Sequence, residues 1–291
     1  MAATLPNNFL GLEPRFSDYR SARYAVLSVP YDSTTSFQAG TRMGPSAIIA
    51  ASQQVELFDE ELGGEFYRTG IATLDPLMPN MAGPEAMHAD IFDYARRVVR
   101  DGKFPLTLGG EHSITSGLVR AVATRHKKFS VLQIDAHADL RDEYEGTPYS
   151  HASVMRRVLD HAVTIVPVGI RNYSRQEHVF IKKAGIEPIS ARECRESVEW
   201  MDRVLERLTD RVYVTIDIDG LDPAYAPGTG TPEPGGLEWY QVIDLLHRVT
   251  REKTMVGADI VEVAPIAGHH ATEFLAAKLA YKLIAFTQHG R

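Results

Sequence analysis

The sequence predicts an α/β protein built on a mainly parallel sheet with crossover helices on both faces. Short apolar runs rich in Val, Ile and Leu alternate with longer amphipathic stretches, which is typical of such sheets. The 291 residues are 44% hydrophobic and 24% charged, close to the averages for globular proteins. Because α/β folds of this length commonly have one core, we expect a single domain over residues 1–291.

Each expected strand is one of the short apolar runs, and the strands follow in order at 24–30, 105–109, 129–135, 163–169, 212–217 and 255–263. The amphipathic stretches between them are the expected helices, at 44–58, 84–100, 113–125, 152–160, 198–208, 237–251 and 272–285. Pro45 and Pro84 lie near helix starts, where a missing N–H does no harm. The Pro- and Gly-rich stretch 220–236 lacks periodicity, and long irregular loops of this kind are usually functional.

Charge and cysteine content exclude several classes of protein. A net charge of −7 argues against a nucleic-acid partner, because such proteins usually present a concentrated basic surface. With Cys194 alone, neither an internal disulfide nor a cysteine zinc cage can form. The first residues show no targeting pattern, and no apolar run reaches the ~20 residues that span a bilayer. We therefore expect a cytoplasmic protein without a membrane partner.

Polar side chains follow the strands at their carboxyl ends, where open parallel sheets bind ligands. The segment 131–140 reads VLQIDAHADL and places Asp135, His137 and Asp139 two residues apart. Alternate side chains of an extended chain share a face, so the three can converge on one point. The motif VYVTIDIDG repeats the arrangement with Asp217 and Asp219.

An Asp after a strand is often only a helix cap or turn former, and that explanation is as good as a ligand role for either segment alone. Five ligand-type residues in two same-face sets are harder to explain as caps. Packed carboxylates repel one another and have raised pKa values unless cations neutralise them. The two segments together therefore indicate a metal site.

His112, in LTLGGEHSIT, is a sixth candidate ligand, because Gly109 and Gly110 allow a tight turn that brings it over the strand ends. A lone His beside a turn is more often a structural hydrogen-bonding group, but its position after a third strand favours a ligand. Four carboxylates match the charge of two divalent ions, and oxygen-rich sites with some imidazole favour Mn²⁺. Two ions about 3.5–4 Å apart lower the pKa of a shared water, which points to hydrolysis.

These motifs resemble those of the ureohydrolase (arginase/agmatinase) family, and within it those of agmatinases most. The resemblance covers almost the whole chain, from SVPYDSTTSFQAGTRMGPSAI through LGGEHS, DAHADL, SHASVMRR and DIDGLDPAYAPGTGTPEPGGL to DIVEVAP. It implies an arginase-like three-layer α/β/α sandwich and a binuclear manganese centre, with two Mn²⁺ per subunit. Such a centre hydrolyses a guanidino group to urea and an amine.

The resemblance also implies a role for each site residue. The ligands of one ion would be His112, Asp135, Asp139 and Asp217, and those of the other Asp135, His137, Asp217 and Asp219. His151 would bind substrate and carry a proton to the leaving amine, although from the sequence alone it could equally be a packing residue at a helix start. Glu262 would pair with the substrate guanidinium, where the sequence alone suggests a buried ion pair. Asp139 and the two ions would stabilise the tetrahedral intermediate.

The expected substrate is agmatine, cleaved to putrescine and urea in polyamine biosynthesis. The loop LRDEYEGTPYSHA carries Asp142, Glu143 and Glu145, and such an acidic rim would favour the terminal ammonium of agmatine, unless the loop is simply exposed to solvent. Arg141, if it points inward, could instead pair with a carboxylate. The alternatives are therefore a guanidinobutyrase, a guanidinopropionase, an arginase or a guanidine hydrolase. A catalytically silent, metal-binding oligomer subunit is a further alternative, which the full ligand set disfavours.

Two expectations concern the surface. The resemblance implies a homo-oligomer, trimeric or hexameric. His269 and His270 follow PIAG where relatives commonly have an acidic residue, and we interpret the pair as a surface or interface feature.

Overall fold

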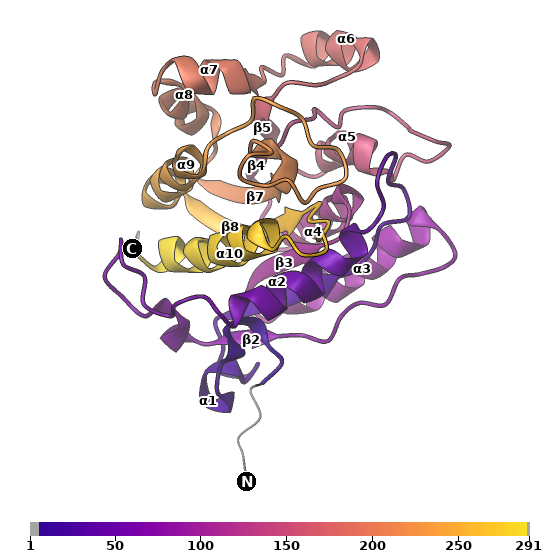
Figure 1. Cartoon of the computed structure of the whole chain (residues 1–291). Coiled ribbons are helices and arrows are strands. Elements are labelled where there is room, and N and C mark those ends of the chain that lie inside the picture. The colour runs from indigo at the N-terminus through magenta and orange to yellow at the C-terminus, as the bar shows by residue number, and fades with distance from the viewer. Residues whose placement is uncertain (1–5, 290–291) are drawn as a thin grey trace.

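The structure, a computed structural model, describes residues 6–289 and is built on one eight-stranded sheet (Figure 1). The strand order is β2-β1-β3-β8-β7-β4-β5-β6, and all neighbouring strands are parallel. The strands are β1 Tyr24–Val29, β2 Ile71–Thr73, β3 Phe104–Gly109, β4 Ser130–Ile134, β5 Thr164–Ile170, β6 Ile189–Ser190, β7 Arg211–Asp217 and β8 Thr254–Val261.

Helices cover both faces of this sheet. On one face lie α2 Gly44–Ser52, α7 Ala191–Glu196, α8 Trp200–Arg207, α9 Trp239–Glu252 and α10 Ala271–His289. On the other lie α3 Pro84–Arg100, α4 Thr115–Ala123, α5 Val154–Val158 and α6 Arg175–Ala184. The short α1, Pro14–Ser17, lies beside β2. In Figure 1, α10 and α2 run side by side in front of the sheet. The α/β/α sandwich with a parallel sheet is therefore confirmed.

The period-two pattern of the strands sends side chains alternately into two apolar cores. In β7, Val212 and Val214 face the core under α9 and α10, and Tyr213 faces the core under α3 and α4. Every residue from Val212 to the end of that strand is buried. Strands buried on both faces read as continuous apolar runs, which is why six of the eight could be predicted.

The sequence did not predict the edge strands β2 and β6 or the helices α1, α6 and α7. β2 and β6 have three and two residues and form the two edges of the sheet, and such runs are too short to show a period. α6 was also missed, although Ser174 and Glu177 form a capping box at its start. The helix expected at 44–58 ends at Ser52. The single domain over 1–291 stays a prediction, and residues 1–5 and 290–291 of it lie outside the described residues.

The strand order places the carboxyl ends of β3, β8, β7 and β4 side by side in the middle of the sheet. The polar segments that follow these four strands therefore meet at one edge, although the first and the last of them lie more than a hundred residues apart in sequence. Among residues 6–289, no helix is both long and apolar enough to cross a bilayer.

Candidate active site

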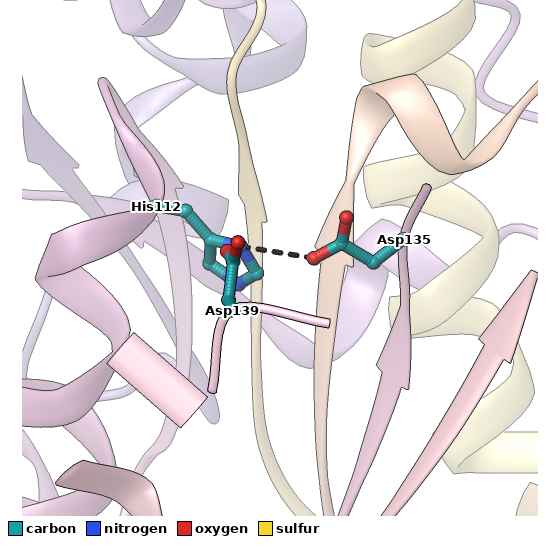
Figure 2. A group of neighbouring side chains, drawn as sticks. All are labelled: His112, Asp135 and Asp139. Carbon is teal, nitrogen blue, oxygen red and sulfur yellow. Dashed lines mark ion pairs between the residues drawn. The ribbon is translucent and has the colours of Figure 1, made fainter. Parts of the chain in front are cut away.

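The predicted ligands meet at this edge in two overlapping groups. His112 begins a short 3-10 turn after β3, and its Nδ1 lies 3.2 Å from an Asp135 oxygen and 3.1 Å from an Asp139 oxygen. Figure 2 shows His112 and Asp135 facing each other, with Asp139 beside the imidazole. His112, Asp135 and Asp139 form one candidate metal group, and all three are buried.

The second candidate group consists of Asp135, His137 and Asp219. His137 Nδ1 lies 3.0 Å from an Asp219 oxygen and 3.8 Å from an Asp135 oxygen. Asp217 lies between the groups, with one oxygen 3.5 Å from His112 Nδ1. The structure thus brings all six predicted ligands together, and Asp135 belongs to both groups.

The side chains after β4 do not converge by strand alternation as expected. β4 ends at Ile134, before the first ligand, and the following residues form a tight loop. Asp139 has a φ of 53°, in the left-handed region that a residue with a side chain rarely adopts. This conformation turns its carboxylate towards His112. The cost of such a backbone is of order 1–3 kcal/mol, and it persists only where the surroundings enforce it.

Hydrogen bonds behind His112 fix which ring nitrogen faces the carboxylates. The buried Asp259 accepts a hydrogen bond from the Thr215 hydroxyl at 2.6 Å, which uses the single proton of that hydroxyl. Thr215 Oγ1, 2.9 Å from His112 Nε2, must therefore accept a hydrogen bond from Nε2–H. The lone pair of the neutral ring is then on Nδ1, which is buried without a well-formed hydrogen bond. Burial disfavours the charged ring, but Asp135 and Asp139 outweigh it and raise the pKa of His112 well above its usual range. Nδ1 therefore needs a positive charge beside it, and a divalent cation bound by the neutral ring would supply that charge.

The electrostatics of the cluster lead to the same conclusion. Burial, together with the charges of Asp219 and Asp135, raises the pKa of Asp217 well above its usual range. Burial and the Asp135 charge raise the pKa of Asp139 to about 7. Burial disfavours the charged form of His137, but Asp219 and Asp135 outweigh it and raise the pKa of this imidazole to about 10. The carboxylates therefore demand positive charge, which two divalent cations would provide.

Glu262 follows β8 directly and has a φ of 63°. Its Oε1 accepts a hydrogen bond from the backbone N–H of His112 at 2.6 Å, and its own N–H donates to the carbonyl of Gly110. Burial and the neighbouring charge of Glu111 raise the pKa of its carboxyl well above the usual range. The buried ion pair suggested by the sequence is not formed within residues 6–289. Instead, the carboxylate lines the cavity.

His151 also lines the cavity and lies at the start of a 3-10 turn that leads into α5. Its backbone N–H donates to Thr34 Oγ1 at 3.1 Å, and its Nε2 lies 3.3 Å from Ser36 Oγ. Tyr144 packs edge-on against the ring. Burial lowers the pKa of His151 to about 4, so the imidazole is neutral near pH 7.

The expected acidic rim is wrong. Asp142 pairs with Arg156 and Arg157 and is 77% exposed, and this loop contributes Arg141 and Tyr144 to the cavity wall instead. Glu143 and Glu145 are exposed and do not line the cavity. Long charged side chains at a loop tip turn to solvent, where hydration stabilises them.

Arg141 itself faces the cavity. Its guanidinium carbon lies 4.9 Å from the centre of the Tyr144 ring, and its Nε lies 3.9 Å from a carboxylate oxygen of Glu177. That carboxylate is buried and accepts the backbone N–H groups of Leu140 and Ser174. The guanidinium of Arg141 thus interacts with both the carboxylate of Glu177 and the ring of Tyr144.

Another part of the cavity wall is formed by the irregular stretch 220–236 that the sequence marked as functional, with Gly230 and Thr231 lining the cavity. Arg171, unnoticed in the sequence, holds this wall. Its guanidinium contacts six backbone carbonyls, those of Gly169, Asp219, Gly220, Leu221, Glu233 and Pro234. Asp222 closes the same loop by accepting the N–H groups of Gly235 and Gly236.

Four further buried residues escaped the sequence analysis as parts of the site: Thr34, Glu111, Thr215 and Asp259. A signal existed for two of them. Asp259 is a carboxylate within an apolar strand, and Glu111 directly precedes a ligand in LGGEHS. Outside the cavity, His270 is exposed and bonds Glu273, and His269 is exposed as well.

Comparisons with known proteins agree with this geometry. The model of the Arginase family matches residues 22–285. An N(1)-aminopropylagmatine ureohydrolase of Synechocystis is 41% identical over 97% of this chain and 94% of its own length. Another of that name, from Thermus thermophilus, is 43% identical over 91% of this chain and 90% of its own. The crystal structure of the agmatine ureohydrolase of Thermoplasma volcanium superposes with a TM-score of 0.89 at 34% identity, covering 99% of this chain and 96% of that one.

Proposed function

The chain belongs to the arginase family and is an agmatinase-type ureohydrolase that acts on agmatine-like guanidino substrates, and from this premise we propose a more specific reaction. With two Mn²⁺ ions bound, the enzyme would hydrolyse a guanidinobutyl amine to urea and the free amine. The substrate is agmatine extended by an aminopropyl group, with agmatine itself as a slower substrate. Agmatine yields putrescine in this reaction.

The observation that carries the proposal is the buried Nδ1 of His112, which faces three carboxylates without a well-formed hydrogen bond. Those residues and the second group would hold the two ions, with Asp135 and Asp217 contributing to both and His137 and Asp219 completing the second. Oxygen ligands with two imidazoles suit manganese. When bound, the ions supply a water molecule whose pKa lies near neutrality.

The residues of the chain do the remaining chemistry. Glu262 offers its carboxylate to the guanidinium, whose planar donors match two oxygens. Asp139, which lines the cavity, would favour the tetrahedral intermediate. As the bond between the guanidino carbon and the alkyl-bearing nitrogen breaks, His151 delivers to that leaving nitrogen a proton lost by the attacking water. The guanidinium and one water thus give urea and an alkylammonium ion, with no change in total charge.

The substrate tail leaves the cavity past aromatic and acidic side chains. Phe37 and Tyr173 border the opening and are 72% and 44% exposed, and Tyr144 lines the wall. Aromatic faces attract ammonium groups, and Glu177 adds a buried carboxylate. These features support a polycation tail longer than that of agmatine, as the names of the two relatives also do.

A second candidate is guanidinobutyrate, which Arg141 favours because its guanidinium faces the cavity and could pair with a carboxylate. Glu177 and Tyr144 already share the Arg141 charge, so we rank this substrate below the amines.

Urea release under equal Mn²⁺ loading tests the proposal. We expect kcat/KM to fall in the order aminopropylagmatine, agmatine, guanidinobutyrate, arginine. Guanidinobutyrate or arginine exceeding both amines by tenfold would overturn the substrate and leave the ureohydrolase intact. Substituting Co²⁺ or Zn²⁺ for Mn²⁺ in the same assay tests the metal.

Two other expectations belong to the proposal: a trimeric or hexameric homo-oligomer and a cytoplasmic location. Sedimentation of the purified protein measures the first. Cell fractionation measures the second.

A further inference from the structure

The hydroxyl of Thr34 joins two parts of the site that are far apart in sequence. Thr34 is buried in the loop after β1, and its Oγ1 donates to Glu111 Oε1 at 2.6 Å. The same oxygen lies 3.1 Å from the backbone nitrogen of His151 and 3.5 Å from its Nδ1. We propose that Thr34, held by Glu111, is a positioning residue that fixes His151 in the tautomer with its proton on Nδ1 and its lone pair on Nε2.

Hydrogen-bond direction carries the inference. A hydroxyl has one proton, and Thr34 gives it to Glu111. With Glu111 ionised, the oxygen can only accept towards His151, so Nδ1 carries the proton of the neutral ring. If Nδ1 carried no proton, its lone pair would face a lone pair of the Thr34 oxygen, and the two would repel each other.

Glu111 cannot release Thr34 easily. Its second carboxylate oxygen accepts the backbone N–H of Thr34 at 2.6 Å, and the Ser113 hydroxyl donates to the first at 2.5 Å. The carboxylate is fully buried and is anchored from three directions. Thr34 is thus oriented before any substrate arrives.

The consequence for catalysis lies on the other side of the ring. Nε2 is near Ser36, and both residues line the cavity. With the lone pair there, Nε2 can take the proton of the attacking water and pass it to the leaving nitrogen, and the ring then returns to its starting tautomer. The inference rests on the proposed role of His151 as proton carrier.

The same device occurs at the metal site, where Asp259 and Thr215 fix the tautomer of His112. In both places a buried carboxylate accepts a hydrogen bond from a threonine hydroxyl, and the threonine oxygen then accepts a hydrogen bond from an imidazole N–H. Orienting groups of this kind commonly set which imidazole nitrogen reacts.

Thr34→Val removes the hydroxyl and keeps the shape. We expect kcat to fall roughly three- to tenfold, the range for one hydrogen bond, with KM and manganese content unchanged. Thr34→Ser should restore kcat. Thr41→Val is the matched control, because Thr41 is also buried and its hydroxyl has no hydrogen-bond partner in the described structure.

A double-mutant cycle separates this role from a structural one. In a His151→Asn background, Thr34→Val should cause no further loss of kcat, because Thr34 acts through the imidazole. An equal loss in both backgrounds, loss of manganese in Thr34→Val, or an unchanged kcat would each overturn the inference.

A spectroscopic test does not depend on activity. In Mg²⁺-loaded protein with ¹⁵N-labelled histidine, the His151 signals are those missing in His151→Asn. We expect a protonated Nδ1 in the wild type and a shift towards a protonated Nε2 in Thr34→Val. A wild-type proton on Nε2 would refute the inference, whereas failure of every guanidino substrate to release urea would refute only the proposed function.

Discussion

The floor and the mouth of the cavity are built on opposite principles. At the floor, Asp135, His112 and Glu262 are buried, and each is fixed by hydrogen bonds to the backbone or to buried side chains. At the mouth, Phe37 is largely exposed. The guanidinium of Arg141 there contacts the Tyr144 ring and lies 3.9 Å from the Glu177 carboxylate. The difference indicates that the floor determines the reaction and the mouth determines which tail is accepted.

The largest effect is expected at the floor. Asp135→Asn removes charge from both candidate metal groups, so the protein should lose most of its manganese and its urea release should fall to background. Asp219→Asn affects one group and should be milder. Elemental analysis of the purified variants measures the metal, with the exposed Asp142→Asn as a control expected to retain it. Two ions per subunit in Asp135→Asn would contradict the shared-ligand assignment.

The second-largest effect is expected at His151, in the cavity wall. His151→Asn should keep both ions and lower kcat by roughly 10²–10⁴-fold, the usual contribution of general acid–base catalysis. Steady-state kinetics and metal analysis are read together, and His112→Asn serves as the comparison that loses metal. A metal loss in His151→Asn as large as in His112→Asn would place His151 among the ligands.

The cavity wall that Arg171 holds should respond less to substitution. Arg171→Met leaves backbone carbonyls of the stretch 219–236 without their hydrogen-bond donor. We therefore expect the free energy of unfolding to fall by about 2–3 kcal/mol and KM to rise several-fold. Chemical denaturation and kinetics measure the two effects. Arg175→Met removes a neighbouring exposed arginine and should change neither. Equal behaviour of the two variants would show that Arg171 does not hold this wall.

The smallest effect is expected at the mouth. Arg141→Met should raise kcat/KM for cationic substrates up to about fivefold, because a half-exposed charge is worth at most about 1 kcal/mol. The same variant should lower kcat/KM for guanidinobutyrate and leave the metal content unchanged. Competition between agmatine and guanidinobutyrate measures the ratio directly. A fall for the cationic substrates would mean that Arg141 orients Glu177 or Tyr144 for the tail.

The sequence predicts the floor of the cavity better than its walls and mouth. The floor residues lie in short motifs directly after buried strands, so local pattern and charge identify them. The Thr34–His151 contact joins residues 117 apart, and the carbonyls that Arg171 contacts lie mostly 48–63 residues away. No local pattern reports such packing. For the same reason the direction of Arg141 could not be predicted, and the edge strands were too short to detect.

The position of β8 bears on how the chain acquires its structure. This strand comes last in sequence yet lies in the middle of the sheet, between β3 and β7. Until it inserts, the earlier strands leave two unpaired edges facing an open slot, which are templates for aggregation. Contacts so distant in sequence also form slowly. Residues 254–261 must therefore leave the ribosome before the sheet can close. We expect a chain that stalls earlier in synthesis to need chaperones that shield its exposed core.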